Sequence, residues 1–238
     1  MEMTMLEVRD LHARYGDSKA LFGIDLSVPA QGGVALLGRN GAGKSTLLKS
    51  LLDAGPQTTG DIHLNGRSLD GLSTEARARL GLALVPEDRR IFTTLTVRQN
   101  LELAWHAAGS QRPTMSVDHV CQLFPLLKDL LERLGYQLSG GQQQLVAVAR
   151  GLMASPTVLL LDEPAEGLAP KVAQDLALQV RQAREKLGLT VLVAEQSIAY
   201  ARRCTEYVYL LDSGTLVFEG DWQTFDARPE LKSRYLAV

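Results

Sequence analysis

The stretch Gly38–Thr46 constrains the fold of this chain more than any other part of the sequence. It reads Gly-Arg-Asn-Gly-Ala-Gly-Lys-Ser-Thr and matches the pattern G-x-x-x-x-G-K-[ST]. An apolar run, Val34–Leu37, precedes it and a helical pattern, Thr46–Leu52, follows it, which is the strand–loop–helix context of a phosphate-binding loop, or P-loop. Its glycines free backbone N–H groups for phosphate oxygens, Lys44 can neutralise charge on the β- and γ-phosphates, and the Ser45 hydroxyl can ligate Mg²⁺. The motif predicts a nucleotide site that consists of Gly38, Arg39, Asn40, Gly41, Ala42, Gly43, Lys44, Ser45 and Thr46.

Two acidic residues end another apolar run. Val158–Leu161 shows no polar alternation, which is typical of a strand buried on both faces of a parallel sheet, and Asp162 and Glu163 follow it directly. Because open α/β sheets bind ligands at the carboxyl ends of their strands, Asp162 is placed to hold Mg²⁺ and Glu163 to polarise a water for in-line attack on the γ-phosphate. A solvated strand end is the plainer alternative, but two acids after so apolar a strand are costly without a cation.

The third feature is the stretch Leu138-Ser139-Gly140-Gly141-Gln142, which directly precedes an apolar run at 145–149. Ser139 can cap a helix that begins there, and the two glycines leave N–H groups uncovered at the positive end of the helix dipole. Such a helix start suits phosphate, although an ordinary loop before a capped helix would look the same. Since the chain also has a P-loop, we interpret Ser139, Gly140, Gly141 and Gln142 as a second phosphate-contacting element.

In this order and spacing, the P-loop, L-S-G-G-Q and strand-terminal Asp-Glu resemble the ATP-binding subunit of an ABC transporter, over essentially the whole chain. The resemblance implies an α/β fold: a P-loop NTPase (RecA-like) parallel-sheet core with an N-terminal antiparallel β subdomain and an inserted helical subdomain. It implies an ATPase with ATP and Mg²⁺ as cofactors, and a dimer in which the L-S-G-G-Q of one subunit faces the ATP on the P-loop of the other. It also places an adenine-stacking aromatic at Tyr15, for which packing near a strand end is the alternative.

Three positions depart from the usual pattern of that family. Glu87 stands where the family has a Gln that touches Mg²⁺ and the attacking water; a glutamate can still ligate Mg²⁺ but adds negative charge. Gln196 stands where most members have a His at the γ-phosphate, and it can donate a hydrogen bond but carries no titratable proton. The loop at 164–170 lacks the aspartate usual at the dimer interface. The predicted catalytic residues are therefore Glu163, Lys44, Gln196 and Glu87, and the predicted metal ligands are Ser45, Asp162 and Glu87.

The segment around Glu87 carries a second expectation from the resemblance, because the family receives a helix of the transmembrane subunit there. The apolar Ile91 and Phe92, followed by Leu95–Val97, could line a groove for that helix. Equally, they could belong to the core of the helical subdomain.

The departures themselves resemble a narrower group. The chain is similar here to the smaller ATPase subunit of branched-chain amino-acid importers, whose relatives serve urea and short amides. The similar stretches are Pro-Glu with Arg-Arg-Ile-Phe and Leu-Thr-Val, then Gly-Leu-Ala-Pro, then Glu-Gln. That resemblance implies transmembrane permease subunits and a second ATPase subunit as partners, in a heterodimer or alternatively a homodimer. A periplasmic or extracellular solute-binding protein would act indirectly. The transported solute itself is not encoded in this subunit.

Two other functions are compatible with the motifs. A soluble ABC ATPase of translation or DNA repair usually has two fused halves or a long coiled-coil insertion, and this chain has neither. A nucleotide-gated binding subunit with little turnover would explain the missing Gln and His, but the intact Glu163 argues against it.

Length, charge, hydropathy and cysteine spacing limit the possible functions and location of the chain. The 238 residues with a net charge of −2 are ample for one domain with a substantial core and show no electrostatic footprint for nucleic acid. No apolar run approaches the length of a bilayer span, residues 1–11 lack a secretory apolar region, and Cys121 and Cys204 show no metal or redox spacing. We therefore expect free thiols and a cytoplasmic subunit that is peripheral on the inner face of the membrane through its permeases.

A coarse reading of the elements gives the organisation. A β-rich start over 5–38 is followed by a P-loop helix, strands at 62–64 and 82–85, a helix at 71–80, and a mostly helical stretch over 97–134 that is broken at 109–113 and at 125. After Asp162 we expect a helix at 170–187, a strand at 190–194, a helix at 198–203 and strands at 206–211 and 215–219. This alternation predicts a parallel sheet. One ABC ATPase domain over 1–238 is expected, with a catalytic core at about 1–89 and 155–238 and a helical subdomain at about 90–154.

Overall fold

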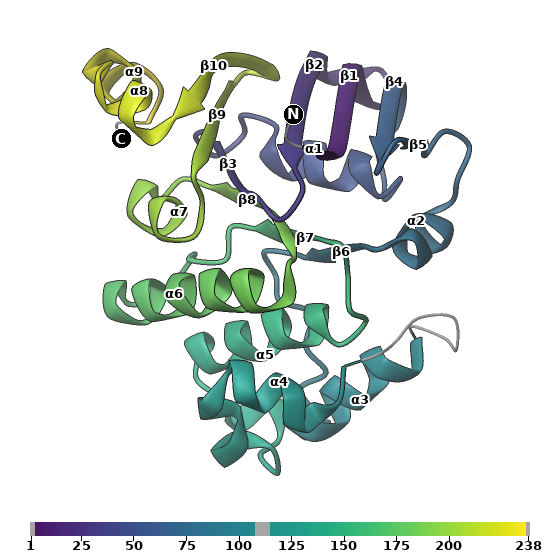
Figure 1. The fold of residues 1–238 in the computed structure, drawn as a ribbon, viewed down its shortest axis with the longest axis vertical. Coiled ribbons are helices and arrows are strands. Elements are labelled where there is room, and N and C mark those ends of the chain that lie inside the picture. Colours follow the sequence, from purple (N-terminus) through teal and green to yellow (C-terminus); the bar gives the residue numbers. More distant parts are fainter. Residues whose placement is uncertain (1–2, 108–114, 237–238) are drawn as a thin grey trace.

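The computed structural model describes residues 3–107 and 115–236 (Figure 1). Its larger sheet has six strands in the order β10-β9-β3-β8-β7-β6. Five are parallel and the edge strand β10 is antiparallel to β9. The strands are β3 (Gly33–Leu37), β6 (Leu82–Val85), β7 (Val158–Asp162), β8 (Thr190–Glu195), β9 (Tyr207–Asp212) and β10 (Thr215–Asp221). Every residue of β3, β7 and β8 is buried, which explains why their sequences show no alternation.

A second, antiparallel sheet lies at the N-terminal end of the chain, with its strands in the order β2-β1-β4-β5. It consists of β1 (Thr4–Tyr15), β2 (Ser18–Pro29), β4 (Gln57–Leu64) and β5 (Arg67–Ser68). Helix α1 (Lys44–Leu51) lies between the two sheets, and its leucines share one buried cluster with side chains from both (Figure 1). The helix that follows the P-loop is thus held on two sides.

Helices cover the opposite face of the larger sheet. They are α6 (Pro170–Leu187), α7 (Ile198–Cys204) and the block between β6 and β7, which contains α3 (Val97–Ala107), α4 (Val117–Leu123), 3-10 turns at Pro125–Leu130 and Gly135–Gln137, and α5 (Gly140–Leu152). One continuous apolar cluster joins α5 and α6 to this face of β7 and β8. The remaining helices are α2 (Thr74–Leu80), α8 (Trp222–Asp226) and α9 (Pro229–Tyr235). Among the described residues, none of the helices has both the length and the apolar character needed to cross a bilayer.

The predicted α/β architecture is confirmed, and the elements around the site begin and end close to the expected residues. The stretch after α3 differs, because 3-10 turns replace the helical pattern expected up to 134. Pro125 opens the first of these turns, where its ring fixes φ and it lacks an N–H donor. The break expected at 109–113 lies outside the described residues.

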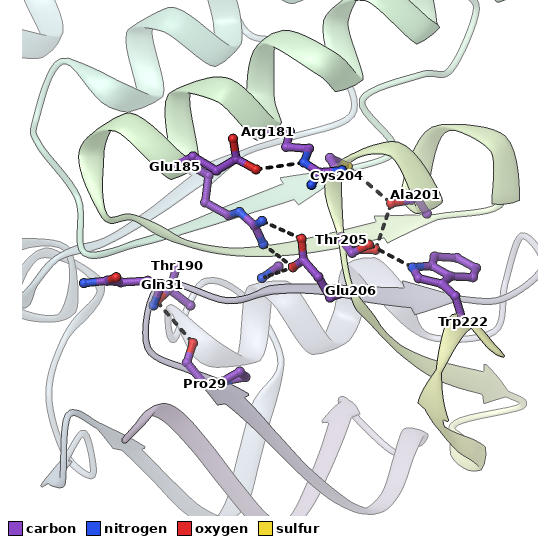
Figure 2. Close-up of polar contacts among 12 residues, drawn as sticks. Pro29, Gln31, Arg181, Glu185, Thr190, Ala201, Cys204, Thr205, Glu206 and Trp222 are labelled. Atoms are coloured by element: carbon purple, nitrogen blue, oxygen red, sulfur yellow. Dashed lines mark hydrogen bonds and ion pairs between the residues drawn. The ribbon is translucent and has the colours of Figure 1, made fainter. Parts of the chain in front are cut away.

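A polar clamp fixes α6 to the end of the sheet where β3 begins. Arg184 of α6 donates to both carboxylate oxygens of Glu206, and Oε2 of Glu206 also accepts the N–H of Gly33 at 3.1 Å. Figure 2 shows this end of the sheet, where Oγ1 of Thr190 also accepts the N–H of Gln31 at 2.9 Å. These contacts stabilise the amino ends of the parallel strands. The candidate functional site lies at the opposite, carboxyl ends.

Candidate functional site

The P-loop joins the carboxyl end of β3 to the first turn of α1. Gly41 and Gly43 have φ angles of 83° and 109°, a region that favours glycine. At Gly38, a Cβ would lie 2.5 Å from the carbonyl oxygen of Leu211, so a side chain there would displace the loop. No side chain caps α1 at Gly43. The first N–H groups of the helix are therefore available to an anion at the positive end of the helix dipole.

Lys44 is buried at the start of α1, and its ammonium group contacts the loop around it. Nζ donates to the carbonyl oxygens of Gly38 at 2.8 Å and Arg39 at 3.1 Å. The same Nζ lies 3.0 Å from Oε1 of Glu163. The structure thus brings together the predicted phosphate-binding lysine and the predicted water-orienting carboxylate.

Ser45 and Asp162 also contact each other. Ser45 follows Lys44 in the sequence, and Asp162 directly precedes Glu163. Oγ of Ser45 donates to Oδ1 of Asp162 at 2.9 Å, and Asp162 is buried. Burial raises the pKa of Asp162, the Ser45 hydrogen bond lowers it, and the charges of Glu163 and Glu87 raise it again. Glu87 therefore lies within electrostatic reach of the predicted metal ligands.

Glu166, which sequence reasoning did not single out, completes an acidic cluster. Burial raises the pKa of Glu166, and the neighbouring carboxylates of Glu87 and Glu163 raise it further by charge and by hydrogen bonding. Glu87, Asp162, Glu163 and Glu166 form this cluster, in which Lys44 pairs with Glu163.

This donor set fits Mg²⁺. A hydroxyl oxygen and a carboxylate oxygen lie side by side at Ser45 and Asp162, and Mg²⁺ prefers oxygen ligands, usually one or two carboxylates together with substrate phosphates and waters. The described residues contain no group of three or more His, Cys, Asp or Glu arranged to hold a metal by themselves.

A hollow of about 460 Å³ opens beside the P-loop. It is lined by Gly41, Gly43, Lys44, Ser45, Thr46 and Glu163, by Lys19, Ala20 and Phe22 of β2, and by Ser213 and Gly214 of the β9–β10 turn. Tyr15 does not line this hollow but a separate groove that also contains Lys49 and Gly55. The aromatic ring that the structure places at the hollow is Phe22, which is 44% exposed. Its sequence signal was weak, since it is one apolar residue on the outward face of a strand.

Ser139 caps α5. Its Oγ accepts the N–H of Gln142 at 3.4 Å, and Oε1 of Gln142 accepts the N–H of Ser139 at 3.0 Å. This is a capping box, so the Gln142 side chain contacts its own helix start. A Cβ at Gly141 would lie 2.6 Å from Cγ1 of Val172, so the close contact between α5 and α6 depends on this glycine. None of Ser139, Gly140, Gly141 and Gln142 lines the P-loop hollow of its own chain.

Gln196 lies in a second hollow of about 370 Å³. That hollow is lined by Asn40, Glu163, Ala165, Glu166, Glu195, Gln196, Ser197 and Leu236. Gln196 therefore shares a cavity with Glu163 and with one P-loop residue, as a contact to the terminal phosphate would require. Glu195 beside it is buried, and its carboxylate accepts three backbone N–H groups.

The side chains of Arg150 and Arg89 stabilise the segment that follows β6. Arg89 and Arg90 have φ angles of 62° and 47°, and Arg150 of α5 donates to their carbonyl oxygens at 3.1 and 2.7 Å. The Arg89 guanidinium lies between α5 and the loop after β7, with Nε 3.2 Å from Oε1 of Gln144 and Nη2 3.4 Å from the carbonyl oxygen of Glu166. The sequence contains the Arg-Arg pair, but nothing in its local pattern predicts these contacts.

A mainly apolar groove of about 990 Å³ lies beside that segment. Residues from α1, α2, β6, α3 and α5 line it, and so do Pro86, Arg90 and Phe92. Phe92 is 52% exposed, with the Arg150 guanidinium 5.8 Å from its ring centre. Ile91 instead packs against the core of the helical block. Of the residues for which the sequence left groove and core open, Phe92 lines the groove, whereas Val97 lies in the core with Ile91 packed against it.

Comparison with known sequences identifies relatives of the chain. Residues 21–166 match the ABC transporter family. The chain is 36% identical over 232 residues to the high-affinity branched-chain amino acid transport ATP-binding protein BraG of Pseudomonas aeruginosa, covering 98% of this chain and 99% of that protein. It is 35% identical to the probable branched-chain amino acid transport ATP-binding protein LivF of Archaeoglobus fulgidus, covering 91% and 92%. It is 34% identical to the methionine import ATP-binding protein MetN of Brucella abortus, covering 95% of this chain but 62% of MetN.

Solved structures share the whole fold. A dimeric ATP-binding cassette in a post-hydrolysis state, bound to ADP and Pi, has a TM-score of 0.78 and 26% identity, covering 91% of this chain and 98% of the other. An ATP-binding subunit of an ABC transporter has a TM-score of 0.77 and 29% identity, covering 98% and 96%.

Proposed function

The chain belongs to the ABC transporter family and is an ATPase subunit, and we propose that it drives import of branched-chain amino acids or related small amides. The observation that carries the catalytic part of the proposal is the contact between Lys44 and Glu163, with 3.0 Å between Nζ and Oε1 beside the P-loop. It places a phosphate-binding cation and a carboxylate able to orient water at one point.

In the proposed mechanism the P-loop N–H groups and Lys44 bind the phosphates of ATP. Lys44 exchanges Glu163 for phosphate oxygens, and the freed Glu163 carboxylate orients a water and takes its proton as the water attacks the γ-phosphorus. The bond from the γ-phosphorus to the bridging oxygen breaks in the same step, and ADP leaves with that oxygen. Gln196 donates a hydrogen bond to the terminal phosphate. Ser45 and Asp162, with Glu87, would hold Mg²⁺, which when bound with ATP offsets the charge of the phosphate oxygens.

The site is completed by a second ATPase subunit in this proposal. Ser139, Gly140 and Gly141 lie at the capped start of α5 and do not line the hollow of their own chain, so they are free to close over nucleotide on the P-loop of a partner. The partner is either a different ATPase subunit or a second copy of this chain.

We base the proposed solute on how much of each relative the chain matches. BraG and LivF match over nearly their whole lengths, whereas MetN extends well beyond the matched part. This favours branched-chain amino acids over methionine. The groove beside Phe92 is the proposed docking site for a permease helix, which would hold the subunit at the inner face of the membrane. A periplasmic or extracellular solute-binding protein would deliver the solute to the permeases.

Glu163→Gln tests the catalytic assignment. The amide keeps the shape of the side chain but cannot take a proton from water, so we expect ATP to bind, steady-state hydrolysis to fall by at least about 100-fold, and ATP-bound dimer to accumulate. The matched control is Glu185→Gln on the exposed side of α6, which should hydrolyse ATP as the unchanged chain does. Undiminished ATPase in Glu163→Gln would reject the role of Glu163.

Transport is tested separately, after co-expression of the chain with the permeases, the second ATPase and the binding protein that the proposal requires, to be sought among the neighbouring genes. Proteoliposomes that contain them should accumulate leucine, isoleucine or valine, or a short amide, only when ATP is supplied on the ATPase side. Uptake of methionine alone would contradict the solute while leaving the ATPase assignment in place. Nucleotide binding without turnover, even with the permeases present, would favour a nucleotide-gated binding subunit, consistent with the substitutions at Glu87 and Gln196.

A further inference from the structure

Glu195 lies between the two strands that carry the halves of the ATP site. It is the last residue of β8, which pairs with β3 on one side and β7 on the other. In the register of the sheet, Glu195 stands opposite Leu37, directly before the P-loop, and Ala194 stands opposite Asp162.

The carboxylate of Glu195 joins two turns that the sheet does not connect. Oε1 accepts the N–H of Ala165 at 2.8 Å, in the loop that follows Glu163. Oε2 accepts the N–H groups of Gln196 at 3.1 Å and Ser197 at 3.0 Å, in the turn that leads into α7. The side chain is 3% exposed, so these bonds are shielded from water.

The backbone next to Ala165 needs such support. Glu163 has a φ of 45°, in a region that costs free energy for a residue with a side chain and persists only where the surroundings hold it. The N–H of Glu163 donates to the carbonyl oxygen of Ala194 at 2.9 Å, and the N–H of Glu166 donates to that of Glu163 at 3.0 Å. The bond from Ala165 to Glu195 fixes the middle of this turn.

We propose that Glu195 is a positioning residue for ATP hydrolysis, whose carboxylate fixes the turn at 163–166 and the turn at 195–197 in one arrangement so that Glu163 and Gln196 face the same phosphate. The proposal rests on the roles proposed above for Glu163 and Gln196. Both carboxylate oxygens of Glu195 accept backbone N–H groups, so its side chain acts through the two turns. Both turns line the second hollow, so a shift of one relative to the other changes the shape of the space where the water and the terminal phosphate would lie.

Joining the two turns through one side chain requires acceptor oxygens on both sides, which an ionised acid supplies. Burial raises the pKa of Glu195 to about 7, against three backbone hydrogen bonds that lower it, and the charge of Glu163 raises it as well. The ionised form is thus costly for folding, but it is the form whose two oxygens can both accept N–H groups. A protonated carboxyl or an amide presents a donor to one of the two turns.

Two substitutions of Glu195 distinguish its hydrogen bond to Ala165 from its hydrogen bonds to the 195–197 turn. In Glu195→Gln the single acceptor oxygen can serve Ala165 or the 195–197 turn, but not both. In Glu195→Asp the shorter carboxylate can still accept N–H groups one and two residues ahead, as aspartates commonly do, but it does not reach Ala165. We expect both variants to bind a non-hydrolysable ATP analogue within about threefold of the unchanged chain and to lose kcat by about 10- to 100-fold, since small misplacements of reacting groups have effects of that size.

Hydrogen exchange gives a readout that does not depend on turnover. Exchange of the peptide that covers 163–168 should accelerate in both variants, and in Glu195→Asp the 196–197 amides should stay protected. The matched control is Glu206→Gln, which removes another carboxylate that accepts a backbone N–H, at the opposite end of the sheet. It should lower thermal stability but leave kcat and the 163–168 exchange unchanged.

The proposal is overturned if both Glu195 variants keep kcat within twofold of the unchanged chain, or if Glu206→Gln loses as much kcat as they do. Failure of the proposed function would look different. In that case Glu163→Gln itself would hydrolyse ATP normally, whatever the Glu195 variants do.

Discussion

The ammonium group of Lys44 lies 3.0 Å from the carboxylate of Glu163, and the two side chains are only 3% and 12% exposed. The group that would bind phosphate and the group that would orient water therefore neutralise each other. Removing one partner of a buried pair leaves the other charge uncompensated. In the proposed mechanism ATP frees Glu163 because it offers phosphate oxygens to Lys44 in exchange. The carboxylate would then become available only when substrate is bound.

Lys44→Ala removes the cation of this pair. We expect ATP affinity to fall by at least about 100-fold, because charge-assisted hydrogen bonds to phosphate are lost in a shielded site. Titration with a fluorescent ATP analogue measures the change. Lys49→Ala, on the same helix but beside the separate groove, should bind the analogue normally, and comparable loss in both variants would contradict the assigned contact.

Ser139→Arg places a long cation at the start of α5. If the signature stretch closes over nucleotide on a partner subunit, the bulk of the arginine side chain should prevent ATP-dependent dimerisation while each chain still binds ATP. Size-exclusion chromatography with light scattering, with the hydrolysis-deficient Glu163→Gln background to stabilise the dimer, reports the association. A dimer of unchanged affinity would argue against a site shared between subunits.

We expect the ion pair between Arg184 and Glu206 to contribute more to the free energy of unfolding than the ion pair between Arg181 and Glu185. Figure 2 shows the region that contains both pairs. Arg184 is 6% exposed and Glu206 is 53% exposed in that pair, whereas Arg181 and Glu185 are 48% and 52% exposed. Arg184→Met should lower the free energy of unfolding by about 2 kcal/mol, less than for a fully buried pair because water can solvate Glu206. Arg181→Met should change it by less than about 0.5 kcal/mol. Urea unfolding measures both values, and equal effects would contradict the clamp.

The sequence predicted those parts of the site whose structure is determined by a short, contiguous sequence pattern. The P-loop, the strand that ends at Asp162 and the Ser139 cap each lie in one short stretch, and the meeting of Ser45 with Asp162 follows because parallel strands place their carboxyl ends on one edge. The bond from Ala165 to Glu195 and the contacts of Arg89 depend on loop conformations with left-handed residues, which no periodic pattern encodes. The 3-10 turns after Pro125 were missed for a related reason, because apolar spacing alone does not separate a short turn from a helix.

Glu195 predicts how stability changes with pH. Burial raises its pKa from 4.5 to about 7, with Glu163 on the neighbouring loop adding to the rise and Tyr200 and Cys204 of α7 buried nearby. The folded chain then binds more protons than the unfolded chain between these two values, so this group's contribution to stability falls as pH rises from about 4.5 to about 7. Glu195→Gln removes the titration. Its free energy of unfolding should therefore rise relative to the unchanged chain across that window, in urea melts at a series of pH values, and a constant difference would contradict the prediction.

Two aromatic residues are candidates for stacking on the adenine ring, and their affinities for nucleotide would distinguish them. Tyr15 was predicted from the family resemblance but lines the groove beside Lys49, whereas Phe22 lines the hollow of the P-loop, where its backbone N–H donates to the carbonyl oxygen of Gly214 at 2.9 Å. Stacking of a base on an aromatic ring contributes about 1–3 kcal/mol, so replacing the stacking residue with alanine should weaken ATP binding by roughly 5- to 150-fold. We expect Phe22→Ala to show this loss and Tyr15→Ala to keep affinity within about twofold, in titrations that compare ATP with inorganic triphosphate. Because triphosphate lacks a base, its affinity should be the same in both variants. A loss confined to Tyr15→Ala would instead show that nucleotide draws Tyr15 into the site.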